Sequence, residues 1–213
     1  MNVTILCSSP THPVNRMLER WVAANQALHT ISLLRHKAEL GGGEILFLIS
    51  CSEIISAKDR QAFSYVLVIH ASDLPRGRGW SPHIWEIVGG ASSITVSLLE
   101  AQDQVDSGSV WQKLVVPIPK HALSDEINEL LFEAESQLMD FAVSNIHSIT
   151  PEPQDPSVMA NYYPRRGPED SELDAQKTIA EQFDLLRVCD PQRFPAFFKL
   201  HGHTYKLIVE KVE

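Results

Sequence analysis

Two places in the chain carry side chains that suit acid–base chemistry. His70 follows the apolar run 65–69 and precedes a loop with Pro and Gly residues that carries Arg76 and Arg78. Asp106 stands later, in a tight Asp-Ser-Gly turn. A histidine and a carboxylate at neighbouring strand ends are the parts of a proton-transfer site. We therefore take His70 and Asp106 as candidate catalytic residues.

The first half of the chain alternates apolar strands with stretches of helical spacing. We expect strands over 3–7, 30–34, 44–49 and 65–70, a helix over 15–26, and a short helix or turn over 56–63. This alternation predicts an α/β, Rossmann-like fold with a mostly parallel sheet. Open sheets of this kind bind ligands at the carboxyl ends of their strands, which is where His70 lies.

The second half predicts a more irregular arrangement. We expect helices over 82–88, 124–144 and 174–189, strands over 94–100 and 110–118, and a small C-terminal β-hairpin with strands over 196–200 and 205–209. The residues 149–168 are Pro-rich and irregular. We expect a core over residues 1–150. A C-terminal extension over residues 151–213 then holds a segment that closes over the substrate, a helix and the hairpin.

Composition narrows the classes of protein and of partner. The chain has 213 residues, 44% of them hydrophobic, and can bury a sizeable core. Its net charge of −9 argues against a nucleic-acid-binding body. The apolar runs are too short for a membrane span, the N-terminus does not resemble a secretory signal, and three isolated cysteines favour a reducing compartment. We expect a cytoplasmic protein that binds neither nucleic acid nor membrane.

His201 and His203 lack a third ligand nearby, so we expect no metal.

Four segments, in the same order along the chain, resemble the folate-dependent formyltransferases. The run His70-Ala-Ser-Asp-Leu-Pro, with Arg78-Gly79 after it, is similar to that family's His-x-Ser-x-Leu-Pro and Arg-Gly segment. The turn at Asp106 falls where the family has an Asp-x-Gly loop. Residues 162–171 and 186–198 resemble the branch that acts on sugar nucleotides. The resemblance implies a formyltransferase core and 10-formyltetrahydrofolate as the formyl donor.

The acceptor implied by the resemblance is the amino group of a nucleotide-linked amino sugar. The run Arg78-Gly-Trp-Ser-Pro-His and the short chain resemble formyltransferases of nonulosonic, pseudaminic-type acid pathways. A UDP-linked 4-amino-dideoxy sugar is then the expected substrate. Because sugar formyltransferases are often dimers, a homodimer is also expected.

The resemblance assigns roles to the candidate pair. His70 would donate to the oxyanion of the tetrahedral intermediate and transfer protons. Asp106 would hold His70 in its charged form and relay a proton to the leaving nitrogen. The chain departs from the family at Val68, where an asparagine is expected two residues before the histidine. Valine cannot donate a hydrogen bond, so Asn15, Ser72 or a backbone N–H becomes the candidate substitute donor.

The ligand contacts implied by the resemblance fall into two groups. The residues expected to bind the folate follow the third strand or lie beside the candidate aspartate: Ser50, Cys51, Ser52, Glu53, Ile54 and Val105. The residues expected to bind the acceptor are Asn15, Ser72, Arg76, Arg78, Gly79, Trp80, Arg165 and Arg166. As simpler alternatives to ligand binding, Arg76 and Arg78 would be solvated residues of the loop, and Trp80 would pack against the protein.

Two alternative functions use the same residues. A non-catalytic protein would keep the folate or nucleotide-sugar pocket and lack turnover, because the asparagine expected at Val68 is absent. A formyltetrahydrofolate hydrolase would use water as the nucleophile, and only its products would distinguish it from a transferase.

Overall fold

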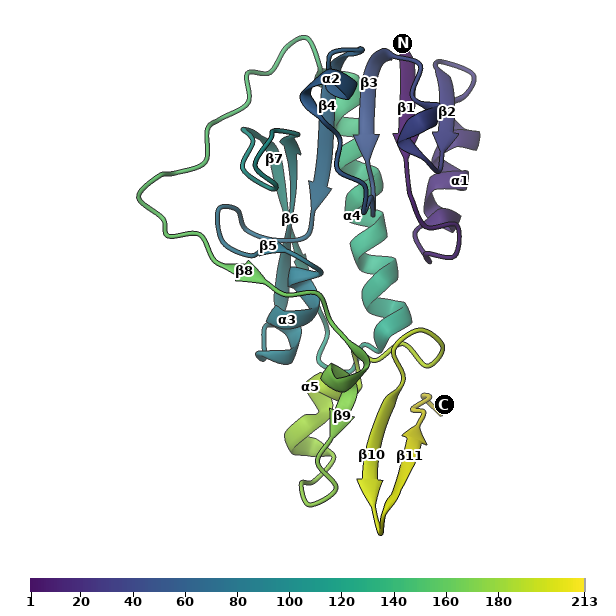
Figure 1. Ribbon diagram of the computed structural model, residues 1–213, viewed down its shortest axis with the longest axis vertical. Helices are drawn as coiled ribbons and strands as arrows, with labels where there is room; N and C mark the ends of the chain where they lie inside the picture. The colour runs from purple at the N-terminus through teal and green to yellow at the C-terminus, as the bar shows by residue number, and fades with distance from the viewer. Residues whose placement is uncertain (213) are drawn as a thin grey trace.

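The computed structural model describes residues 1–212, and its centre is one six-stranded sheet (Figure 1). In the order of the sheet, the strands are β2 (Thr30–Leu34), β1 (Asn2–Leu6), β3 (Gly43–Leu48), β4 (Phe63–His70), β6 (Ser93–Glu100) and β7 (Val110–Pro117). The first four strands are parallel, and β6 and β7 are antiparallel to their neighbours. The expected α/β fold with a mostly parallel sheet is confirmed.

The two faces of the sheet are covered differently. Because side chains alternate along a strand, Leu67 and Ile69 of β4 join the main core beneath α1 (Asn15–Asn25) and α4 (Ser124–Asn145). Val66 and Val68 point the other way and pack on a second cluster that includes Ile55 of the loop after β3. His70 has the same parity as Val68, so the catalytic candidate lies on the face away from the two long helices.

The longest helix, α4, packs along the sheet (Figure 1). Its buried residues recur at helical spacing, among them Ile127, Leu131, Leu138 and Ala142. At its start the carboxylate of Glu126 accepts a hydrogen bond from the backbone N–H of Leu123 at 2.8 Å. This contact satisfies one of the free N–H groups at the helix end.

A long connection returns from α4 across the loops of the sheet, and we call its residues 152–166 the strap (Figure 1). It begins with a bridge between Glu152 and Val110. Further on, β8 (Tyr162–Tyr163) pairs in parallel with β5 (Arg78–Gly79), in the loop between β4 and α3 (Pro82–Val88). The strap therefore lies against the loop that follows His70.

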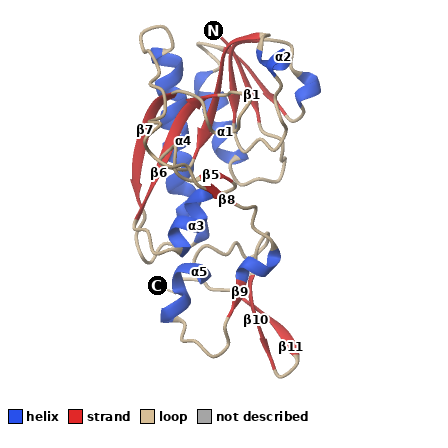
Figure 2. Cartoon of the chain, turned by 60° about the vertical axis from the view of Figure 1, so that its left-hand side comes forward, coloured by secondary structure: helices blue, strands red, loops and turns tan. Residues whose placement is uncertain are grey.

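The C-terminal residues form a small sheet of their own that projects from the rest of the chain (Figure 2). Its strands are β9 (Glu172–Leu173), β10 (Ala196–Leu200) and β11 (His203–Leu207). The hairpin turn is His201-Gly202, with positive φ at both residues, so the second strand begins at 203 rather than at the expected 205. The expected domain division at residue 150 stays a prediction.

The helix expected over 174–189 is wrong at its start, and its end at 189 is also wrong, because the helical residues stop at Leu186. Only η3 (Ala180–Gln182) and α5 (Phe183–Leu186) are helical. The side-chain amide of Gln182 accepts from the backbone N–H of Asp174 at 2.9 Å and donates to its carbonyl at 3.0 Å. These bonds hold residues 174–179 in a turn, because local side-chain bonds compete with a helix for backbone groups.

Three further helical elements are short. They are η1 (Lys37–Glu39) before β3, α2 (Ala57–Arg60) before β4, and η2 (Pro168–Ser171) after the strap. Among residues 1–212, no helix combines the length and the apolar character that a membrane span requires.

Candidate functional site

His70 and Asp106 come together as the sequence predicts. Nδ1 of His70 lies 3.6 Å from Oδ1 of Asp106, and their side chains are 10% and 6% exposed. On the other side of the ring, Nε2 of His70 lies 2.8 Å from the carbonyl oxygen of Gly77. Both ring nitrogens of His70 therefore face an oxygen, one from the Asp106 carboxylate and one from the Gly77 backbone carbonyl.

The loop that carries Asp106 is tightly built. Asp106 itself has φ of 55°, a left-handed conformation that few residues other than glycine adopt. Two residues later, a Cβ on Gly108 would lie 1.9 Å from the carbonyl oxygen of Glu100. Glycine is therefore required for the turn that brings Asp106 to His70.

Gly79 is a neighbour of Asp106 as well as a candidate contact to the acceptor. Its backbone N–H donates to Oδ2 of Asp106 at 2.9 Å. Gly79 has φ of 98°, and a Cβ added to it would lie 2.5 Å from the carbonyl oxygen of Tyr163. No other residue therefore fits at this position without strain. Gly79 thus fixes the second oxygen of Asp106 and lets the strap approach.

Position 68 offers no polar group. Val68 packs with the second apolar cluster, on the same face as His70. The side-chain amide of Asn15, the first candidate for a substitute donor, is engaged by residues of the β1–α1 loop and by Arg35 after β2. Its Nδ2 donates to the carbonyls of Ser9 and His12 at 2.9 and 2.8 Å, and its Oδ1 accepts from Arg35 at 2.6 Å.

Ser72 is the second candidate for the missing donor, and it lies beneath the loop after β4. It is fully buried, and its hydroxyl has no hydrogen-bond partner among the described residues. A Cβ added to Gly77 would stand 2.6 Å from the Cβ of Ser72. Ser72 therefore packs against the same Gly77 that contacts His70.

The four predicted arginines are placed differently. Arg78 donates to Oε1 of Gln154 at 2.7 Å and lies over the ring of Tyr162, 6.0 Å from its centroid. Arg166 donates to the carbonyl of Asp170 at 2.8 Å and is half-buried, so it contacts the turn after the strap, and its contact with the acceptor stays a prediction.

Arg165 and Arg76 remain available to a ligand. The guanidinium of Arg165 lies 5.1 Å from the ring of Trp80, which is 45% exposed. Arg76 is exposed in the loop after β4. A planar cation over an exposed indole is a surface suited to an aromatic, negatively charged ligand.

The expected folate loop is ordered by contacts to its neighbours. Ser50 has φ of 46°, and the backbone N–H of Ser52 donates to the hydroxyl of Ser8 at 2.8 Å. Glu53 accepts from the backbone N–H of Lys37 at 3.0 Å. Cys51 is half-buried and packs on the second apolar cluster.

Two apolar side chains in the expected folate set face solvent. Ile54 is 69% exposed and Val105 is 52% exposed. Contact of this loop and of Val105 with folate stays a prediction.

Sequence reasoning missed His83, at the start of α3. Its Nδ1 is buried with no hydrogen-bond partner among residues 1–212. Burial lowers the pKa of His83 from 6.5 to about 3, with further contributions from His70, His12 and Arg166. The ring is therefore neutral near neutral pH. In the sequence it stands only as the last residue of the run Arg78-Gly-Trp-Ser-Pro-His, to which no chemical role was assigned.

Sequence reasoning also missed two amides of the strap. Gln154 contacts the loop of Asp106, and Asn161 contacts the loop after His70. Both contacts join residues far apart in the chain, and both amides stand in a segment that has no periodic pattern. Nothing local could have revealed them.

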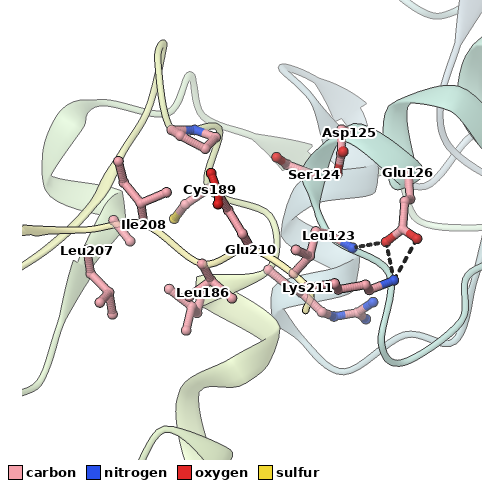
Figure 3. A pocket seen from close by; sticks show the side chains of 14 residues that line it. Leu123, Ser124, Asp125, Glu126, Leu186, Cys189, Leu207, Ile208, Glu210 and Lys211 are labelled. Atoms are coloured by element: carbon pink, nitrogen blue, oxygen red, sulfur yellow. Dashed lines mark hydrogen bonds and ion pairs between the residues drawn. The ribbon is translucent and has the colours of Figure 1, made fainter. Parts of the chain in front are cut away.

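A groove of about 410 Å³ lies elsewhere, between the start of α4 and the C-terminal segment (Figure 3). Its polar wall includes the ion pair of Glu126 with Lys211, with Nζ 2.6 Å from Oε1. It contains none of the predicted site residues, so the chemistry of the chain points to the His70 region instead.

Comparison with known proteins identifies what the chain resembles. The family described as formyl transferase matches residues 8–143. Methionyl-tRNA formyltransferase of Streptococcus pneumoniae is 27% identical over 173 residues, which cover 78% of this chain and 53% of that protein. The chain therefore spans about half the length of the curated relatives it matches.

Solved structures share the fold. Methionyl-tRNA formyltransferase from Clostridium thermocellum superposes with a TM-score of 0.79 at 21% identity, over 96% of this chain and 90% of that one. A sugar N-formyltransferase from a Shewanella species superposes with a TM-score of 0.71 at 17% identity, over 100% of this chain and 99% of that one. At these identities the likeness establishes the architecture alone.

Proposed function

Because the chain belongs to the formyl transferase family, we propose that it transfers a formyl group from 10-formyltetrahydrofolate to an amino group. The observation that carries the proposal is the buried pair of His70 and Asp106, 3.6 Å apart at the carboxyl end of β4. An imidazolium held by a carboxylate can donate to an oxyanion and exchange protons, which are the two requirements of acyl transfer to nitrogen.

The proposed reaction needs few groups from the protein. The acceptor nitrogen forms a bond to the formyl carbon, and the bond from that carbon to the donor nitrogen breaks. Between the two steps, His70 donates Nε2–H to the oxyanion and shares it with the carbonyl of Gly77. The attacking amine gives one proton to Asp106, which relays it to the leaving nitrogen, while His70 stays protonated as the donor to the oxyanion.

We propose a nucleotide-linked amino sugar as the acceptor. The exposed indole of Trp80 under Arg165 supports this proposal, because it suits a base and a phosphate. The net charge of −9 weighs against a tRNA acceptor, whose backbone binds to extended basic surfaces. The UDP-linked 4-amino-dideoxy sugar of a pseudaminic-type pathway is the specific acceptor that the resemblance favours.

Val68 favours a second candidate function. With an apolar side chain where the family places an asparagine, the protein would bind folate without turnover, or would turn over slowly. Loss of one oxyanion donor typically slows an enzyme about 100-fold or more. Only a measurement of formylated product can therefore distinguish a slow transferase from an inactive binding protein.

The test is a product assay. The protein is incubated with 10-formyltetrahydrofolate and a panel of UDP- and dTDP-linked amino sugars and methionyl-tRNA, and the products are read by mass spectrometry. Formylation of one amino sugar, abolished in His70→Ala and Asp106→Ala, is the expected result. Formylation of the tRNA alone would overturn the proposed acceptor. Binding of folate without formylation of any acceptor would favour the second candidate.

A further inference from the structure

Two side-chain amides of the strap hold the loops that carry the candidate catalytic pair. Gln154 contacts the backbone of Asp106, and Asn161 contacts Gly77, the partner of His70. We propose that Gln154 and Asn161 are positioning residues, through which the strap fixes the geometry of His70 and Asp106. The effect on turnover rests on the proposed function, whereas the positioning itself does not.

Gln154 uses all of its amide hydrogens and its oxygen at this point. Its Nε2 donates to the carbonyl of Asp106 at 2.8 Å and to that of Gly108 at 3.0 Å. Its Oε1 accepts from Arg78 at 2.7 Å. Asp106 has a left-handed backbone, and such conformations persist only when their surroundings hold them. Gln154 supplies that hold directly at the carbonyl of the strained residue.

Asn161 acts on the loop after His70 through both its side chain and its backbone. Its Oδ1 accepts from the N–H of Gly77 at 2.9 Å, and its carbonyl accepts from the N–H of Arg78 at 3.0 Å. The N–H of Arg78 and the carbonyl of Gly77 belong to one peptide unit, in which they point in opposite directions. Holding that N–H on the strap side directs the carbonyl of Gly77 toward Nε2 of His70.

Gly77 is tightly packed in the loop. It has φ of 73°, and a Cβ at this position would clash with Ser72, so only glycine fits here. Asn161 thus clamps the backbone on both sides of a glycine whose carbonyl orients the histidine ring. Because ring orientation sets which nitrogen can donate to an oxyanion, a strap residue controls the proton donor without touching the substrate.

The experiment measures the ring hydrogen of His70 in the full chain, labelled with ¹⁵N-histidine and free of ligand. The Nε2–H signal is assigned by its loss in His70→Gln. In Asn161→Leu, which has a similar shape and no acceptor, the exchange of this hydrogen with solvent should quicken by about 10-fold, as expected for one lost hydrogen bond. Asn161→Asp keeps an acceptor for Gly77 and should retain the slow exchange. Asn161→Ala serves if the leucine variant fails to fold.

Gln154→Met tests the second amide of the strap, and Met159→Ala is the matched control variant. Met159 lies on the same strap and is 87% exposed, so its truncation should change neither exchange nor turnover. Gln154→Met and Asn161→Leu should each lower kcat by about 10-fold, with KM for the formyl donor within about twofold of wild type.

The two readouts separate the inference from the proposed function. Faster exchange in Asn161→Leu, with wild type inactive on every acceptor, would support the positioning and count against the function. Unchanged exchange and unchanged kcat in the Gln154 and Asn161 variants of an active enzyme would overturn the positioning.

Discussion

Asp106 accepts the backbone N–H of Gly79 at 2.9 Å with one oxygen and faces His70 with the other. The Arg-Gly segment and the Asp-Ser-Gly turn, which are separate in sequence, thus meet on a single carboxylate. Asp106 is therefore the residue that joins the histidine to the loop beneath the strap.

The charge of Asp106 can be removed while its shape is kept. In Asp106→Asn, an amide oxygen can still accept from Gly79, and His70 loses its anionic partner. We expect kcat to fall by about 100-fold or more, because the imidazolium is no longer stabilised. Steady-state kinetics would measure this, and thermal denaturation would show a folded protein. A variant with wild-type kcat would mean that Asp106 only builds the turn.

Gly79 should tolerate no side chain. Gly79→Ala places a methyl group 2.5 Å from the carbonyl of Tyr163 at a φ of 98°. We expect a loss of about 1–3 kcal/mol in the free energy of unfolding, together with loss of turnover as the strap moves away. Chemical denaturation measures the first quantity.

Gly41→Ala is the matched control for this substitution, since nothing described lies within 4 Å of its added Cβ. We expect it to leave stability and turnover near wild type. Equal effects of the two alanines would contradict the steric argument.

The apolar residue at position 68 can be exchanged for the family's asparagine. Val68→Asn puts an amide on the same face as His70, at a cost of about 1–3 kcal/mol from the apolar cluster around it. If His70 and Asp106 already turn over substrate, kcat should change by less than about 10-fold, because the existing donors already meet most of the demand. Activity that appears only in the variant would identify the native chain as a binding protein.

Glu135 predicts a pH dependence of stability that is separate from catalysis. Burial in α4 raises its pKa from 4.5 to about 8. The folded state therefore holds a proton that the unfolded chain releases above about pH 4.5, and the free energy of unfolding should fall as pH rises from there through 8. Denaturant titrations at several pH values measure this fall.

Glu135→Gln should flatten the pH profile of stability, because the amide has no proton to lose. Glu129→Gln, on the exposed side of the same helix, should leave the wild-type slope unchanged. A wild-type slope in Glu135→Gln would assign the pH dependence to another group.

The sequence was a good guide to the sheet and to His70, because strand spacing and the break after residue 70 are local signals. The pairing of His70 with Asp106, which the residue types at two loop positions already indicated, is present in the structure. The sequence did not reveal that Ser9, His12 and Arg35 contact the amide of Asn15, and a role for Asn15 in binding stays a prediction.

The strap was beyond sequence reasoning for a physical reason. Asn161 meets Gly77 across 84 positions, and Gln154 meets Asp106 across 48. Neither contact has a period, a cap or a turn that would mark it. The prediction of a helix starting at 174 was wrong because the side chain of Gln182 bonds the backbone of Asp174. The spacing of apolar residues gives no information about such a contact.

The most direct test of the central claim follows the formyl carbon itself. Donor labelled with ¹³C in the formyl group is mixed with the protein and the preferred amino sugar, and the label is followed by NMR. We predict that it moves into a formamide on the sugar, at a rate that falls with Asp106→Asn. Label that appears as formate at the same rate without the sugar would contradict transfer and indicate hydrolysis. Label that stays on the donor would contradict catalysis altogether.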